Sequence, residues 1–112
     1  MAELTAQAMT RAGLKATYST PTGAGNDYFA NHGNQFVHIK NGGAVSTTMS
    51  ITVAGKVDGL SVSARTVVTP AGEEKFVGPF PIESYNDSGG NVIIAFSAVT
   101  NVGVAVLTHG AL

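Results

Sequence analysis

The chain has 112 residues and a net charge of −1, and its charged fraction of 12% is well below the roughly 25% of an average soluble domain. Its length is typical of one domain that buries a core without disulfides, and the absence of cysteine excludes thiol catalysis and cysteine-ligated metal centres. The charge balance argues against nucleic acid as a partner, and no apolar run reaches the roughly 20 residues of a membrane helix.

Residues 1–13 are expected to form an N-terminal arm or a short helix, ahead of a domain over residues 14–112. Thr5 is placed to cap a helix over residues 6–12, with Leu4 and Met9 at the two positions of a hydrophobic staple. An extended arm is the alternative, because threonine-rich sequence also suits it. The segment has no basic stretch followed by an apolar one, so we expect no secretory signal.

The next residues predict one strand and then a long loop. Residues 14–18 alternate in polarity, as expected for a first strand. Residues 19–34 are rich in Gly and Asn, which favour turns, and predict a loop with a short turn at residues 27–29. Tyr28 and Phe29 are expected to tuck under the domain edge and anchor this loop.

A hairpin is predicted over residues 35–53. Residues 35–40 form its first strand, and Asn-Gly-Gly at residues 41–43 is a hairpin signal. In the second strand, residues 45–53, the odd-numbered positions are mostly apolar and the even-numbered ones carry hydroxyls. This period of two predicts one buried face and one hydrated face.

A second hairpin is predicted where two apolar runs, residues 66–69 and 75–78, flank the sequence Pro-Ala-Gly-Glu-Glu. Gly72 permits the positive φ that a chain reversal often needs. The sequence Gly-Pro-Phe-Pro at residues 78–81 then ends the second run, because proline has no N–H for a continuing ladder.

Residues 92–98 and 102–108 predict a final hairpin about Thr100 and Asn101. With the other runs, this gives six or seven strands separated by turns. The pattern is typical of an all-β fold, a single antiparallel β-sandwich or a small barrel, here with an N-terminal arm.

No pattern of catalytic residues is present, so we expect a protein that is not an enzyme and holds no cofactor or metal. His32, His38 and His109 lie far apart and have no metal-ligand spacing, so each is expected to face solvent or to make a hydrogen bond. Glu73 and Glu74 are adjacent in a turn and are expected to be solvated rather than to converge on a substrate.

The strand pattern resembles that of small all-β structural proteins from tailed bacteriophage virions. The resembling elements span about residues 35–107 and carry the sequences Phe-Val-His-Ile-Lys-Asn-Gly-Gly at 36–43, Val-Thr-Pro-Ala-Gly-Glu-Glu at 68–74, Gly-Pro-Phe-Pro at 78–81, and Phe-Ser-Ala-Val-Thr-Asn-Val-Gly-Val-Ala-Val at 96–106. The resemblance supplies no catalytic residues to carry over.

The role that this resemblance implies is a capsid decoration protein, also called a cement protein. Such a protein is made in the host cytoplasm and binds the outside of the shell formed by the major capsid protein. A homotrimer is the oligomer that the resemblance favours. Residues 1–13 and 19–34 are the expected gripping segments, which gives Leu4, Met9, Tyr28 and Phe29 as candidate capsid or subunit contacts.

Two alternatives remain open. One is another virion part with the same kind of core, such as a head–tail connector, a tail component or a fibre-base component. The other is a carbohydrate-binding module, which needs aromatic side chains grouped on one exposed face; Tyr28 and Tyr85 are the residues to test for it.

Overall fold

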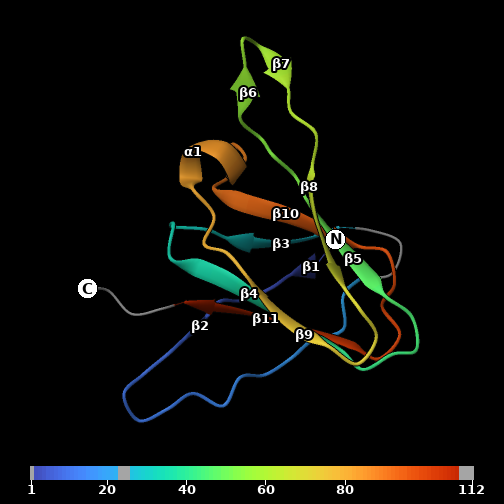
Figure 1. Ribbon diagram of the computed structural model, residues 1–112. Coiled ribbons are helices and arrows are strands. Elements are labelled where there is room, and N and C mark those ends of the chain that lie inside the picture. The colour runs from blue at the N-terminus through green and yellow to red at the C-terminus, as the bar shows by residue number, and fades with distance from the viewer. Residues whose placement is uncertain (1, 23–25, 109–112) are drawn as a thin grey trace.

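The protein folds into two facing β-sheets, as Figure 1 shows for the computed structural model, which describes residues 2–22 and 26–108. Sheet A holds five strands in the order β1 (Ala2–Glu3), β3 (Asp27–Ala30), β10 (Asn91–Phe96), β5 (Thr47–Ile51) and β8 (Arg65–Thr69). Sheet B holds four in the order β2 (Gln7–Ala8), β11 (Val102–Thr108), β4 (Gln35–Asn41) and β9 (Glu74–Val77). Outside the sheets lie a small hairpin, β6 (Lys56–Val57) and β7 (Leu60–Ser61), and one helical turn, α1 (Ile82–Tyr85).

The core lies between the two sheets and consists of alternate residues from their central strands. The fully buried side chains from these strands are Val37 and Ile39 of β4, Met49 and Ile51 of β5, Val92 and Ile94 of β10, and Val104 and Val106 of β11. In β5 the intervening Thr48 and Ser50 are only half-buried, as the period-two pattern predicts. The expected all-β sandwich is therefore confirmed.

The three predicted hairpins are wrong, because in each case the two strands lie in different sheets. β4 and β5, β8 and β9, and β10 and β11 are each split between sheet B and sheet A. Each connection therefore crosses the sandwich. β4 instead pairs with β9 and β11, while β5 pairs with β8 and β10. Turn residues permit a reversal of the chain, but they do not decide whether it occurs within a sheet or across the core.

The buried amide of Asn41 joins two of these crossings. Its Nδ2 donates to the carbonyls of Val45 and Thr69, each at 2.9 Å, and its Oδ1 accepts from the backbone N–H of Gly43. The Asn41 carbonyl also accepts a 2.7 Å hydrogen bond from the N–H of Gly72, which has the expected positive φ of 79°. One side chain thus satisfies backbone groups at the point where β4 ends and β8 ends.

The expected helix over residues 6–12 is not present, and the N-terminal segment is part of both sheets. β1 pairs in parallel with β3 in sheet A, and β2 pairs in parallel with β11 in sheet B. Leu4, between these strands, is buried in the core. Residues 2–8 therefore pair with both sheets of the sandwich.

The first predicted strand and the long loop also differ from the structure. Residues 14–18 form no strand, and only Ser19 makes an isolated bridge, to Val104 of β11. Within the expected loop, residues 27–30 form β3, with Asp27 and Phe29 buried. Thr22 donates two hydrogen bonds to the Asp27 carboxylate, from its N–H at 3.0 Å and from its hydroxyl at 2.6 Å. These bonds compensate the burial of Asp27 at the start of β3. Among the described residues, no helix is long and apolar enough to cross a membrane.

Candidate functional site

Aromatic side chains gather on the outer face of sheet B. Phe36, His38 and Lys40 alternate with the core residues of β4, so their side chains point away from the core. Phe76 of β9 pairs with His38 and stacks on its imidazole, with ring centroids 4.0 Å apart and planes 5° apart. The ring centroid of Phe36 lies 6.0 Å from that of Phe76. Phe76 itself remains 67% exposed, which makes its ring a large apolar surface in contact with water.

The segment of residues 9–18 lies against this face and is fastened to it at Tyr18. The Tyr18 hydroxyl is 2.6 Å from Nδ1 of His38, and the Tyr18 ring packs edge-on against the imidazole. Lys40 Nζ lies 4.3 Å from the Tyr18 ring centroid, within the range of a cation–π interaction. Next to Tyr18, the Gln7 amide forms two 2.8 Å hydrogen bonds with the backbone N–H and carbonyl of Thr17, which join the two ends of the segment.

Between this segment and sheet B lies a pocket of about 380 Å³, which we call the aromatic pocket. Its lining residues are Met9, Thr10, Gly13, Leu14, Ala16, Tyr18, His38, Phe76 and Leu107. Met9 and Leu14 are both substantially exposed at its rim. The described lining contains no carboxylate, so the pocket offers mainly apolar and aromatic contact, with Tyr18 and His38 as its titratable groups.

The two ring nitrogens of His38 lie close to polar side chains of its neighbours. Its Nε2 is 3.0 Å from Oε1 of the exposed Glu74, while Nδ1 faces the Tyr18 hydroxyl. The Tyr18 hydroxyl and Nδ1 form a hydrogen bond, whereas the contact between the buried Nε2 and Glu74 lacks hydrogen-bond geometry. One ring nitrogen is thus hydrogen-bonded, and one ring face is covered by Phe76. The arrangement fastens residues 9–18 to the sheet.

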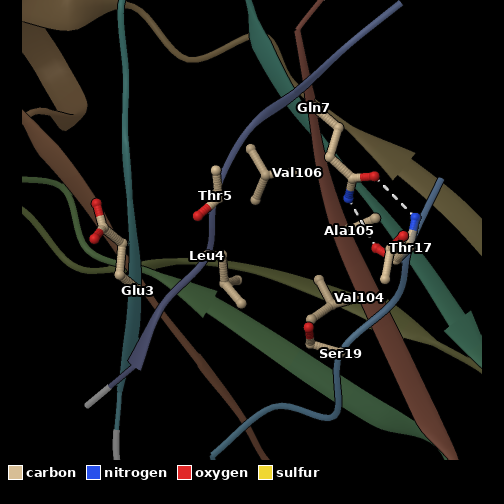
Figure 2. A pocket seen from close by; sticks show the side chains of 9 residues that line it. All are labelled: Glu3, Leu4, Thr5, Gln7, Thr17, Ser19, Val104, Ala105 and Val106. Carbon is tan, nitrogen blue, oxygen red and sulfur yellow. Dashed lines mark hydrogen bonds between the residues drawn. The ribbon is translucent and has the colours of Figure 1, made fainter. Parts of the chain in front are cut away.

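A second pocket, of about 350 Å³, lies where the N-terminal segment passes between the sheets (Figure 2). Leu4 and Gln7 of this segment line it together with Thr17, Val104 and Val106. Figure 2 shows the Gln7 amide turned to Thr17, so its polar atoms are occupied, while Glu3 lies at the opposite side. The pocket has no second titratable group to work with Glu3.

The sequence-predicted contact residues are separated by the fold. Leu4 and Phe29 are buried in the core, and Leu4 also lines the second pocket. Tyr28 lies half-buried on the outer face of sheet A. Met9 alone lines the aromatic pocket.

Sequence reasoning missed Tyr18, Leu14 and Phe76 as surface residues. Phe76 follows Glu73, Glu74 and Lys75. A large apolar residue directly after three charged ones is the sequence feature that could have indicated an exposed aromatic ring. Tyr18 gave no such signal, because its partner His38 is 20 residues away.

The remaining histidines add no chemistry to the described structure. His32 is exposed in a loop, where its backbone N–H donates to Gln35 Oε1. His109 lies outside the described residues. Among residues 2–22 and 26–108, no cluster of three or more His, Asp or Glu is arranged to hold a metal ion.

Comparison with known proteins identifies no relative: no family model matches the chain, and neither a curated protein nor a solved structure is significantly similar to it.

Proposed function

We propose that this chain is a non-enzymatic structural protein of a bacteriophage virion that binds the outer surface of the capsid shell. The observation that carries the proposal is the exposed aromatic pocket on a rigid β-sandwich, which suits contact with another protein better than it suits catalysis. Its sequence resemblance to small virion proteins, over about residues 35–107, supplies the kind of partner, the major capsid protein.

The chemistry of the two outer faces supports this orientation. The outer face of sheet A carries the hydroxyls of Thr48, Ser50 and Thr66, with Val68 as an exposed apolar side chain among them. The outer face of sheet B exposes Phe76 and the rim residues Met9 and Leu14 instead. Fully burying a side chain of this size is worth about 1.5–3 kcal/mol, so capsid contact is best placed on sheet B.

The experiment mixes the purified protein with capsids that lack it and follows binding by co-sedimentation. We expect saturable binding at a fixed ratio to capsid subunits, and greater resistance of the decorated shell to heat. A shell that binds no protein at saturating concentrations contradicts the proposal.

The double substitution of Met9→Ser and Leu14→Ser tests the assigned face. Both side chains are exposed, so the fold is expected to be retained, while the apolar rim is lost. Losing about 1.4 kcal/mol of contact corresponds to tenfold weaker capsid binding, which we take as the smallest expected effect. The matched control is Val45→Ser, which removes an exposed apolar side chain that lines none of the pockets described above. Equal binding by the two variants excludes the aromatic pocket as the contact.

Carbohydrate binding is the second candidate, and the exposed ring of Phe76 favours it. Sugars stack on flat aromatic rings, and one face of Phe76 is free while His38 supports the other. Tyr85 is a poorer candidate than the sequence indicates, because it packs edge-on against the buried Phe80. Sub-millimolar glycan binding that disappears in Phe76→Ala would favour this function over capsid decoration.

A further inference from the structure

The β6–β7 hairpin exposes two large apolar side chains at its tip. Val57 and Leu60 pair directly across the hairpin and are 65% and 71% exposed. The hairpin extends away from both sheets beyond the start of β8 (Figure 1). Isolated two-stranded hairpins are only marginally stable in water. A rigid partner that covers Val57 and Leu60 would therefore stabilise this element as well as bind it.

A groove of matching character lies between β8 and β9, the edge strands of the two sheets, with a volume of about 760 Å³. We call it the edge groove. Its apolar lining includes Val62, Val67, Val77, Pro79 and Phe80. The described lining also includes Arg65 and Lys75 but no carboxylate. The groove therefore combines an apolar floor with positive charge.

The hairpin tip and the edge groove are complementary in both polarity and charge. Asp58 lies between Val57 and Leu60 in the turn, so the tip presents one carboxylate flanked by two apolar side chains. The exposed Lys56 precedes Val57 in β6, and strand alternation turns its side chain to the opposite face of the hairpin. The groove presents two cations beside apolar side chains. Within one copy, the residues that follow the hairpin, Val62 and Ser63, already line the groove, and the hairpin points away from it (Figure 1). The tip that fills a groove must come from another copy.

We propose that the β6–β7 hairpin of one copy docks in the edge groove of a second copy of this chain. The contact joins two different surfaces, so it is heterologous, and successive copies close into a ring when the rotation between them permits. The inference rests on the proposed function only for the expectation of three copies. It adds to that function the elements that hold the copies together.

The first test measures the mass of the full chain in solution by sedimentation velocity over a wide concentration range. The wild-type protein is expected to sediment as a multiple of the 11.4 kDa chain. Leu60→Asp, which places a charge on the docking tip, is expected to shift the protein to monomer and weaken association at least tenfold. Leu60→Ser is a milder second variant, and Val45→Asp, at an exposed apolar site away from both surfaces, is the control that keeps the wild-type mass.

A mixing experiment then separates this contact from any other interface. The double variant Val62→Asp with Lys75→Glu damages the groove but keeps the hairpin, whereas Leu60→Asp keeps the groove. Each is expected to be monomeric alone, and the mixture is expected to form a 1:1 complex, because one intact hairpin meets one intact groove. Circular dichroism and urea unfolding show whether each variant is folded.

The outcomes distinguish this inference from the proposed function, because no capsid is present. A wild-type chain that stays monomeric, a folded Leu60→Asp that keeps the wild-type mass, or folded variants that fail to complement each other overturns the docking contact. A monomer that still decorates capsids leaves the proposed function intact. An oligomer that matches these expectations but binds no capsid supports the docking contact and contradicts the proposed function.

Discussion

At the scale of single residues, Asn41 is the side chain on which the sheet crossings depend most. It is buried at the end of β4, and its amide binds the carbonyls of Val45 and Thr69. Val45 lies in the connection before β5 and Thr69 is the last residue of β8, so both carbonyls lie where the strand ladders end. A neutral amide that donates twice and accepts once fits these three backbone groups.

Replacing Asn41 by Asp is therefore expected to destabilise the fold by about 2–4 kcal/mol, because two buried carbonyls lose their donors and a carboxylate enters the core. Urea unfolding measures the loss. Asn101→Asp is the matched control, since Asn101 is exposed and Asp also tolerates its positive φ of 57°. If both variants unfold at the same urea concentration, Asn41 does not have the role described.

The sequence allowed the surroundings of residue His38 to be predicted only in part. Strand alternation correctly placed His38 on the same face as Phe36 and Lys40. The hydrogen bond with Tyr18 could not be foreseen, because it depends on how residues 9–18 cross the sheet. Periodicity reports the face of a side chain, but it does not identify a partner that comes from an irregular segment.

At the scale of elements, the strands around the core were predictable and their partners were not. The runs at residues 35–40 and 45–53 form β4 and β5 close to the expected bounds. Their connection crosses the core because the inward-facing residues of both strands meet across it rather than along one sheet. A signal for this arrangement was present in the buried polar residues at the strand ends, Asn41, Thr47 and Thr69, which lie where backbone groups leave their ladders.

The N-terminal strands were missed because each is only two residues long and pairs at a sheet edge. No periodicity can be read from two residues. The Gln7 side chain contributes to this edge as a peptide group would, by one accepted and one donated hydrogen bond to Thr17. This amide closes the loop of residues 8–17.

Gln7→Glu is expected to open that loop, because a carboxylate cannot donate to the Thr17 carbonyl. Trypsin is the probe, since Arg11 and Lys15 lie within the loop. A loss of about 1 kcal/mol raises the open population, and hence the cleavage rate, about fivefold. Glu3→Gln, the reverse exchange on the same segment, is the control. Unchanged cleavage in Gln7→Glu shows that the Tyr18–His38 contact alone holds the loop.

At the scale of the whole molecule, the low content of charged residues corresponds to three exposed surfaces that carry apolar side chains. The chain exposes an aromatic pocket on sheet B, an apolar hairpin tip, and a groove between the two edge strands. These three surfaces are distinct, although Phe76 borders both the pocket and the groove. A chain that uses one surface for a shell and two for its own copies needs few surface charges, because the centres of interfaces are depleted in them.

The low charge of the chain predicts covered surface, whereas the surfaces themselves could not be identified from the sequence. Leu60 and Val57 look like ordinary strand residues in the chain, and only the fold shows that their hairpin stands clear of the core. The residues of the edge groove come from β8, β9 and the segments around them, which are brought together by the crossing between sheets.

The proposed function is tested most directly by the number of copies of this chain per virion. Quantitative mass spectrometry of purified particles gives that number relative to the major capsid protein. Decoration predicts a fixed ratio to capsid subunits that holds when the shell size changes. A copy number equal to a single ring, independent of shell size, contradicts decoration and identifies a connector or tail component instead.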